Sequence, residues 1–222
     1  MEHKHVVRSV RFSNDGTRLL TGGNRKIVRL FDMGDLSAEP EEIGRHEDHI
    51  KIAMFLPDPN LLVSGGKDGF LRVWDLRKAE GEKEVKTLKV DGPVMSIELS
   101  WDKKFLTVAA GKEVSFWDVN TLEQIKSYKL NITVDSASLH PDADRFLAGG
   151  DDNWVHVFGY DDGKEREAHK GHHGPVHAVR YAPTGTSYAS GSDDGTIRIW
   201  QTNPLAESAP GEVVQVDKQQ QP

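Results

Sequence analysis

Short runs in which apolar and polar residues alternate recur along this chain, and turn-forming residues separate them. In the segment from Gly171 to Trp200 these runs are Val176 to Tyr181, Ser187 to Gly191 and Thr196 to Trp200. Pro183 and Gly185 lie in the first break, and Asp193-Asp194-Gly195 forms the second. Alternation with a period of two residues, bounded by Pro, Gly and Asp, predicts strands joined by tight hairpins.

The third run ends in an aromatic residue, and aromatic residues occupy the same slot at regular intervals along the chain. These marker residues are Phe31, Trp74, Trp117, Phe158 and Trp200, at spacings of 43, 43, 41 and 42 residues. A Gly-His pair at the start of the last copy and the Trp at its end resemble a WD repeat. One small sheet cannot bury both of its faces, so the copies must pack side by side. We therefore expect an all-β WD40 β-propeller over residues 1–202, with five four-stranded blades.

The remaining copies predict the same order of strands. Each starts with an inner strand, and the second and third strands are expected at 19–23 and 27–32, 61–65 and 70–75, 105–109 and 114–118, and 146–150 and 154–159. Outer strands are expected at 41–44 and near 124–130, and the polar segment 76–86 is expected to be a long hairpin loop. Residues 203–222 contain three prolines and three consecutive glutamines, which predicts a disordered polar tail with a candidate edge strand at 212–216.

Composition limits the classes of function. The 222 residues are 36% hydrophobic and 28% charged, and they include no cysteine, which excludes disulfides, thiolate zinc sites and a cysteine nucleophile. The first residues are charged and do not resemble a secretory signal, and no apolar run is long enough to predict membrane insertion. A formal charge of −7 disfavours a nonspecific grip on nucleic-acid phosphates.

In WD repeats a His, a Ser or Thr, an Asp and a Trp form a buried hydrogen-bonded set within a blade, which we call the brace. A buried carboxylate is tolerated only when it is paired, so these residues are expected to be structural. Ser, His and Asp also occur together in hydrolases, but the chain lacks a nucleophile elbow, and we expect no catalytic residue. The set is complete in two copies: His46, Ser64, Asp68 and Trp74, and His172, Ser190, Asp194 and Trp200.

The other three copies lack parts of the brace. The first has His3 and Thr21 but Arg25 and Phe31 in the last two slots, and the third keeps Thr107 and Trp117 but has Val90 and Gly111. The fourth keeps only Asp152, which is therefore expected in a more open turn. Apolar packing is expected to hold these three blades together.

Other residues that suggest chemistry have plainer interpretations. His169, His172, His173 and His177 lie close together in sequence, but strand alternation sends their side chains in different directions, and we expect no metal site. No phosphate-binding or dinucleotide-binding glycine motif is present, so no cofactor is expected. Trp101 lies in a predicted turn, where we expect it to be exposed as a candidate contact residue.

In WD propellers, residues that flank the first apolar position of the inner strand, and the residue before the Asp slot, lie on the top rim around the channel. The positive charges come from the first two copies and the negative charges from the last two, which resembles a protein-docking surface more than a nucleic-acid groove. The alternative that these are only solvated charges stays open. Carried over residue by residue, the protein-binding rim is Arg8, His49, Lys51, Lys67, Met95, Asp135, Asp151, His177 and Asp193.

Four runs of sequence resemble one particular family of WD-repeat proteins. They are EHKHVVRSVRF, LLTGG, SASLHPDADRFLAGGDDNWVHVF and KGHHGPVHAVRYAPTGTSYASGSDDGTIRIWQT, and the resemblance extends over residues 2–202. The family is that of the serine/threonine kinase receptor-associated protein, also described as the unr-interacting protein. It implies a seven-bladed noncatalytic scaffold, associated with the survival of motor neuron complex that loads Sm proteins onto spliceosomal small nuclear RNAs, and with receptor-kinase signalling.

The number of copies departs from that family, because only five of seven repeats are visible. The chain matches the family from its third repeat onward, and we expect an open or incomplete ring in preference to a strained five-bladed one.

The resemblance implies a scaffold for spliceosomal snRNP assembly and mRNA splicing in the cytoplasm and nucleus, without cofactor or metal. Its expected partners are ribonucleoprotein-assembly components or receptor kinases, with RNA contacted indirectly. The alternatives are an adaptor in receptor serine/threonine kinase signalling, a peptide-reading propeller of a ligase, and a direct RNA binder.

Overall fold

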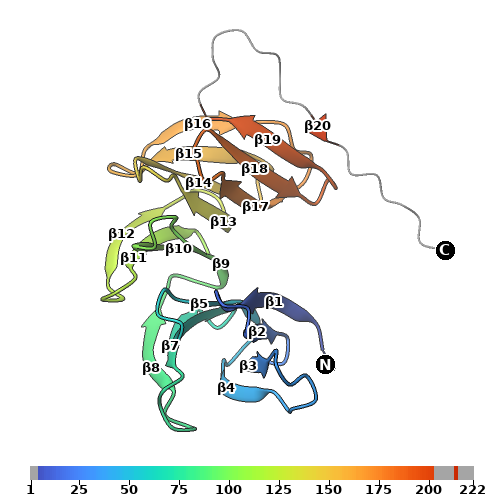
Figure 1. Cartoon of the computed structure of the whole chain (residues 1–222). Coiled ribbons are helices and arrows are strands. Elements are labelled where there is room, and N and C mark those ends of the chain that lie inside the picture. Colours follow the sequence, from blue (N-terminus) through green and yellow to red (C-terminus); the bar gives the residue numbers. More distant parts are fainter. Residues whose placement is uncertain (1–4, 203–212, 215–222) are drawn as a thin grey trace, which may run out of the picture. The chain divides into compact units, whose positions relative to one another are not determined.

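The computed structural model describes residues 5–202 and 213–214. These residues form strands and no helix. Each sheet consists of strands that follow one another in the sequence, so that neighbours along the chain are also neighbours in the sheet (Figure 1). The chain divides into two compact units, Met1–Ile97 and Glu98–Pro222. The all-β fold with repeated four-stranded sheets is that of a WD40 propeller, as the alternating pattern predicts.

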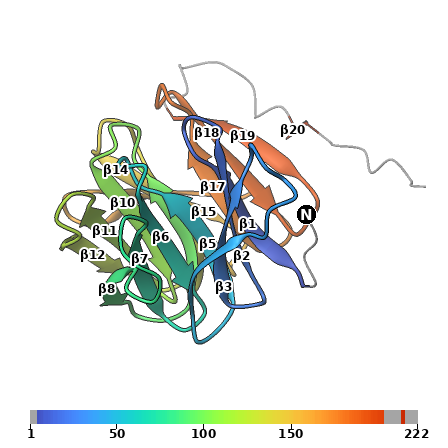
Figure 2. The same ribbon diagram turned by 60° about the horizontal axis from the view of Figure 1, so that its bottom comes forward.

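The first unit contains two complete sheets. The first sheet has the order β1 (Val7–Phe12), β2 (Arg18–Gly23), β3 (Ile27–Asp32) and β4 (Glu41–Arg45). The second sheet has the order β5 (Ile50–Phe55), β6 (Leu61–Gly66), β7 (Phe70–Asp75) and β8 (Glu84–Lys89). The first strands of the two sheets, β1 and β5, lie side by side (Figure 1 and Figure 2). Strand β9 (Val94–Leu99) contains the boundary between the units.

The second unit continues the pattern. The third sheet contributes β10 (Phe105–Ala110), β11 (Glu113–Asp118) and β12 (Gln124–Lys129). The fourth sheet has β13 (Val134–Leu139), β14 (Arg145–Gly150), β15 (Val155–Gly159) and β16 (Glu165–His169). The fifth sheet has β17 (Val176–Tyr181), β18 (Ser187–Ser192), β19 (Ile197–Gln201) and β20 (Val213–Val214).

Two of the hairpin turns contain an Asp-Gly pair whose residues suit the turn conformation. Gly69 and Gly195 join the second and third strands of their sheets with φ of 77° and 78°, in the left-handed region that glycine adopts without steric cost. Each follows an Asp, and the backbone N–H groups of Phe70 and Thr196 donate to Asp68 and Asp194 across these turns. The Asp-Gly pairs therefore set the positions at which the third strands begin.

Neighbouring sheets within each unit share an apolar core. In the first unit, Leu20, Val28 and Leu30 of the first sheet pack with Ile50 and Ala53 of the second. Serines on inner strands add polar links. The Ser9 hydroxyl lies 3.1 Å from the Ala53 carbonyl oxygen and 3.0 Å from the Ala53 nitrogen, and Ser136 bonds Val179 in the same way. The repeat spacing therefore places equivalent side chains against one another, as a propeller requires.

Four-stranded blades imply an outer strand in each copy, but the sequence pattern did not locate the outer strands of the second and fourth copies. Strand β8 begins at Glu84, inside the segment 76–86 that we predicted as a loop, and β16 occupies 165–169. Both strands have exposed side chains on each face, so their sequences lack the apolar alternation that marks the other strands. They form because the third strand of each sheet offers an unpaired backbone edge, and pairing satisfies its hydrogen bonds.

At the C-terminal end, Val213–Val214 pairs with Ile197 and Arg198 of β19. The other residues of the predicted tail, 203–212 and 215–222, lie outside the described residues, as does His3 of the first brace. The disordered tail and the open ring stay predictions.

Candidate functional site

The brace of the second sheet is a chain of hydrogen bonds from three different elements. The Trp74 indole N–H donates to the Ser64 hydroxyl at 2.8 Å, and that hydroxyl lies 2.7 Å from His46 Nε2. His46 Nδ1 lies 3.0 Å from an Asp68 carboxylate oxygen. Burial lowers the pKa of His46, although the nearby Asp68 carboxylate acts to raise it. The net lowering of the pKa keeps the ring neutral. A neutral ring that donates a hydrogen bond from Nδ1 to Asp68 accepts one from the Ser64 hydroxyl at Nε2. Both ring nitrogens, the Ser64 hydroxyl and the Trp74 N–H therefore have partners within the brace.

The fifth sheet repeats this geometry. The Trp200 indole N–H donates to Ser190 at 2.8 Å, Ser190 lies 2.7 Å from His172 Nε2, and His172 Nδ1 lies 3.0 Å from Asp194. Although burial by itself raises the pKa of Asp194, the N–H of His173 and both donors of Thr196 hold that pKa well below its ordinary range. The carboxylate stays charged and fixes the loop that precedes β17 to the turn that precedes β19. Neither serine is exposed, so neither is placed to attack a substrate.

The third and fourth sheets contain polar contacts of a different kind. In the third sheet the Trp117 indole N–H donates to Ser115 on its own strand at 2.9 Å. In the fourth, buried His156 lies 2.8 Å from both Asp152 and Glu165. The Asp152 carboxylate is 28% exposed, against 4% for Asp68 and 9% for Asp194, so its turn is the more open one, as expected, although β15 braces it through His156. The sequence signal was present, since His156 is a polar residue at an inward-facing position of an otherwise apolar strand.

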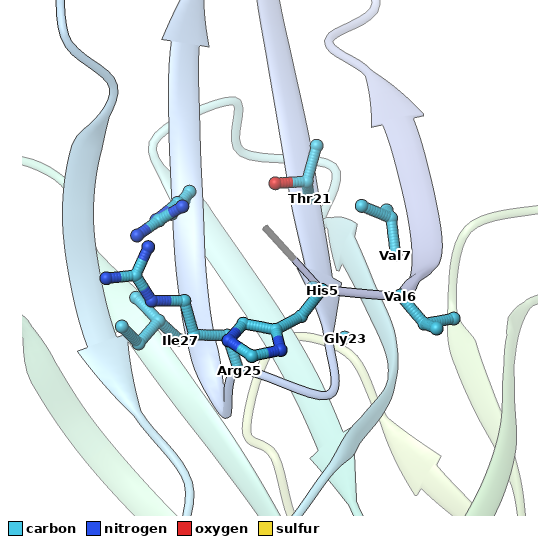
Figure 3. Close-up of a pocket in the computed structure, with 9 residues that line it drawn as sticks. His5, Val6, Val7, Thr21, Gly23, Arg25 and Ile27 are labelled. Atoms are coloured by element: carbon cyan, nitrogen blue, oxygen red, sulfur yellow. The ribbon is translucent and has the colours of Figure 1, made fainter. Parts of the chain in front are cut away.

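In the first sheet the brace position is a small pocket (Figure 3). Its lining residues include His5, Thr21, Arg25 and Arg29, and its volume is about 20 Å³, close to that of one water molecule. Thr21 is buried, and Arg25 occupies the slot that Asp68 fills in the second sheet. Arg29 of β3 donates a hydrogen bond to Glu42 of β4 at 3.0 Å, which links the third and fourth strands of this sheet.

The predicted rim residues occupy equivalent places in their sheets. In four sheets the backbone N–H of the residue after the second strand donates to the carbonyl oxygen of the residue before the first strand. These bonds are Asn24 to Val6 at 3.0 Å, Lys67 to His49 at 2.9 Å, Asp151 to Thr133 at 3.3 Å and Asp193 to Pro175 at 3.1 Å. The repeated bond sets these residues at the same end of each sheet.

The rim of the first unit is cationic. Arg8 and Lys67 are exposed, while His49, Lys51 and Met95 are half-buried. The Arg8 Nε donates to the Asn24 side chain at 2.6 Å, which holds the guanidinium over the turn after β2. We call Arg8, His49, Lys51 and Lys67 the basic rim.

The rim of the second unit is acidic and includes a bridge between two sheets. His177 Nδ1 lies 2.5 Å from Asp135 on β13, and its Nε2 lies 3.0 Å from Asp193 in the turn after β18. The hydrogen bond with Asp193, together with that to Asp135, raises the pKa of His177 despite partial burial. Asp151 is exposed and accepts the Thr133 N–H at 3.1 Å. The bridge was not anticipated, although Asp135 and His177 occupy the same slot in consecutive repeats.

The histidines near the last repeat do not converge. His172 bonds its brace, His177 bonds two rim aspartates, and the His169 ring packs 5.3 Å from Trp200. Among the described residues, no group of three or more His, Cys, Asp or Glu side chains is placed to hold a metal ion.

Within the same residues, no helix has the length and apolar character that crossing a membrane requires. Trp101 is exposed in its turn, as expected.

The sequence matches the family described as WD domain, G-beta repeat. The matched residues are 1–32, 41–75 and 163–201, which correspond to the first, second and fifth repeats. The third and fourth repeats, in which the residues of the brace are replaced, fall outside these matches.

Similar full-length proteins give a narrower assignment. The serine-threonine kinase receptor-associated protein of Dictyostelium discoideum is 43% identical over 202 residues, covering 90% of this chain and 68% of that protein. The protein of the same name from Gallus gallus is 42% identical over 91% of this chain. This chain belongs to the serine-threonine kinase receptor-associated protein family. Eukaryotic translation initiation factor 3 subunit I of Nematostella vectensis is a more distant relative, at 27% identity.

The chain spans 57% of the length of the Gallus gallus relative. Membership in this family, together with the WD repeats and the all-β sheets, makes the chain a WD-repeat protein of the scaffold type.

Proposed function

We propose that this protein is a noncatalytic docking scaffold that holds protein partners at the charged ends of its sheets. The observation that carries the proposal is the repeated rim geometry, in which one backbone hydrogen bond recurs at the same end of four sheets and presents a charged residue in three of them, Lys67, Asp151 and Asp193. The serines and histidines of the two complete braces are buried and mutually satisfied, which supports a structural role for them.

The basic rim fits an acidic segment of a partner protein. Charge complementarity of this kind steers association and selects partners more than it adds affinity. On the family resemblance, the partners are components of spliceosomal snRNP assembly in the cytoplasm and nucleus, including the survival of motor neuron complex, with RNA contacted through them. This role would support mRNA splicing.

A second candidate function is adaptor in receptor serine/threonine kinase signalling. The observation that favours it is the name of the relatives, which are serine-threonine kinase receptor-associated proteins. In that case the partner would be a receptor kinase domain in place of a ribonucleoprotein component.

The test is a pull-down from cell extract with the purified chain as bait. Lys51→Glu combined with Lys67→Glu reverses two charges of the basic rim, and we expect it to weaken capture several-fold without lowering Tm. The matched control is Lys78→Glu with Lys103→Glu, which reverses two exposed charges in the turns after β7 and β9, at the end of these strands opposite the rim. Unchanged capture by the rim variant, or an equal loss by the control, would remove the assignment of the basic rim.

The identity of the captured proteins separates the two candidates. Sm proteins and survival of motor neuron components, retained after nuclease treatment, would support the role in snRNP assembly. Capture of a receptor serine/threonine kinase in their absence would support the adaptor. Loss of all capture after nuclease treatment would favour the direct RNA binder and contradict both.

A further inference from the structure

The arginine on the third strand of the second sheet is paired with two carboxylates. The Arg72 guanidinium of β7 donates to Glu84 of the outer strand β8 at 3.0 Å. It also lies 3.8 Å from the carboxylate of Asp68, in the turn before β7. Asp68 is the acidic member of the brace and is bonded there by His46. The half-buried guanidinium of Arg72 therefore has a negative partner on the outer strand and another in the turn.

The corresponding arginine of the first sheet has only the first of these two partners. Arg29 of β3 is buried and donates to Glu42 of the outer strand β4 at 3.0 Å, as in the second sheet. Glu42 is shared with Arg45, at 3.4 Å. The slot of Asp68 is occupied by Arg25, so a positive charge replaces the negative one in the turn. One carboxylate thus serves a cluster of guanidinium groups, which leaves an excess of positive charge beside a buried arginine.

The place of the missing carboxylate is a pocket in the first sheet. In the second sheet, a Cβ added at Gly66 would lie 2.8 Å from an Asp68 carboxylate oxygen and 2.9 Å from His46 Nδ1. At Gly23, in the same slot of the first sheet, the three atoms nearest to an added Cβ belong to the backbone of residues 6–8. Gly23 lines the pocket of about 20 Å³ described above. Side chains of the brace fill this position in the second sheet, whereas the first sheet has a pocket there.

The lining of the pocket is suited to an anion. Arg25 and Arg29 contribute guanidinium groups, Thr21 contributes a hydroxyl, and His5 contributes an imidazole ring. Figure 3 shows the His5 ring beside the Arg25 side chain. None of the described residues that line the pocket is acidic. Guanidinium groups bind carboxylates and phosphates through charge-assisted hydrogen bonds, so both kinds of anion match this chemistry.

The volume of the pocket favours a carboxylate over a phosphate group. A volume of about 20 Å³ accepts one water-sized group, which matches one oxygen of a planar carboxylate better than the tetrahedral set of oxygens on a phosphate. The pocket also adjoins the basic rim, because Val6 and Val7 line it and the next residue is Arg8.

We propose that this pocket binds the carboxylate of an Asp or Glu side chain of a partner protein, at the position that Asp68 fills in the second sheet. The inference rests on the proposed function, since that side chain belongs to the acidic segment that docks on the basic rim. The partner supplies the acidic group that the first brace lacks, and Arg25, Arg29 and Thr21 donate hydrogen bonds to it. The rim charges steer the segment, whereas the pocket fixes one acidic residue in place.

The first experiment tests the pocket without a partner. Sodium formate is titrated into the purified chain at constant ionic strength, and NMR follows the backbone amide signals. We expect saturable shifts at Thr21, Gly23 and Arg25. Arg25→Asp supplies the carboxylate from within the chain, so it should abolish these shifts without lowering Tm. Lys26→Asp makes the same change of charge at the next exposed residue of the turn, outside the described lining, and should keep the shifts.

The second experiment tests the source of the carboxylate. Fluorescence anisotropy measures the binding of a labelled acidic peptide to the same variants. Arg25→Asp should weaken binding about tenfold, as expected for the loss of one charge-assisted hydrogen bond, and Lys26→Asp should weaken it much less. Arg25→Gln removes a guanidinium without filling the pocket, so its affinity should lie between those of the wild type and Arg25→Asp.

The outcomes separate this proposal from the proposed function. Peptide binding that is lost in Lys51→Glu with Lys67→Glu but unchanged in Arg25→Asp would support the basic rim and overturn the pocket. Formate shifts that are absent from the wild type, or that persist in Arg25→Asp, would also overturn the pocket. So would inorganic phosphate that saturates the same signals at a lower concentration than formate. Formate binding by a chain that captures no acidic peptide would overturn the partner as the source, together with the proposed function.

Discussion

At the scale of single residues, the hydroxyl groups of Ser64 and Ser190 each connect the Trp and the His of a complete brace. Each accepts a hydrogen bond from an indole N–H and pairs with an imidazole nitrogen, all in a buried place. Thr107 occupies the same slot in the third sheet, and its buried hydroxyl has no hydrogen-bond partner among the described residues. The same slot therefore has two different energetic roles.

Ser64→Ala is predicted to lower the free energy of unfolding by about 1–3 kcal/mol, because it leaves the Trp74 N–H and a His46 nitrogen buried and unpaired. Thr107→Val keeps the side-chain shape and removes only an unpartnered hydroxyl, so it should leave that free energy unchanged or raise it. Urea denaturation of the two variants beside the wild type checks the difference. Equal losses would contradict the assigned role of the serine.

His177 is predicted to titrate above its ordinary pKa of 6.5, because Asp193 and Asp135 favour its charged form. A pKa raised by folding contributes stability that is full below the unfolded value and is lost as pH rises through the folded value. His177→Gln should therefore destabilise the protein at pH 5.5 more than at pH 8.5, pH values about one to two units on either side of the ordinary value. An NMR titration of the ring gives the pKa directly, and a midpoint at or below 6.5 would contradict the bridge.

At the scale of secondary-structure elements, glycines in the second strands control how closely consecutive sheets approach. A strand interior disfavours glycine, since it adds no packing and loses the most entropy on folding. Gly22, Gly65 and Gly149 are each covered by aliphatic side chains of the following inner strand. The space that a missing Cβ leaves is thus the place where the next sheet packs.

Gly149→Ala is predicted to destabilise the protein by about 1–3 kcal/mol, because the new methyl group overlaps Val176. Gly191→Ala, at the same slot of the fifth sheet, meets only Ala178 at an ordinary contact distance of 3.9 Å and should be neutral or slightly stabilising. Thermal unfolding monitored by circular dichroism compares the two. A Gly191→Ala variant that loses as much Tm as Gly149→Ala would show that strand conformation decides the effect, and not the neighbouring sheet.

At the scale of the whole molecule, charge is distributed unevenly. The chain carries a formal charge of −7, but the basic rim of the first unit concentrates Arg8, Lys51 and Lys67 at one end of two sheets. Such a local field acts on a charged partner over about one Debye length. The net charge of the chain therefore does not describe the charge of this surface.

Capture of an acidic peptide is predicted to fall as salt rises from about 0.1 M to about 1 M, because the Debye length falls from about 10 Å to about 3 Å. The Lys51→Glu and Lys67→Glu double variant should bind weakly at both concentrations, and a basic peptide of equal length should bind the wild-type rim weakly. Fluorescence anisotropy measures each affinity. Salt-independent capture of the acidic peptide would indicate an apolar contact in place of the basic rim.

The repeat itself could be predicted from sequence, as could most strands and the residues of both complete braces. A period near 42 residues, turns rich in Asp, Gly and Pro, and alternation along inner strands are local properties that each repeat carries in full. The positions of the outer strands β8 and β16 could not be predicted, since these strands are held by backbone pairing to a neighbour and not by apolar side chains.

Tertiary structure alone decided which polar side chains meet, both within the fourth repeat and between the fourth and fifth repeats. The brace of His156 with Asp152 and Glu165, and the bridge of His177 with Asp135 and Asp193, depend on distances between strands that no local pattern encodes. An open or incomplete ring was expected to leave apolar faces of the two end sheets uncovered, and the structure identifies exposed side chains there as Val10, Phe12, Ile197 and Ile199, whose sequence slots are those of buried residues. Sequence specifies which faces are apolar, but burial depends on whether a neighbouring sheet is present to cover them.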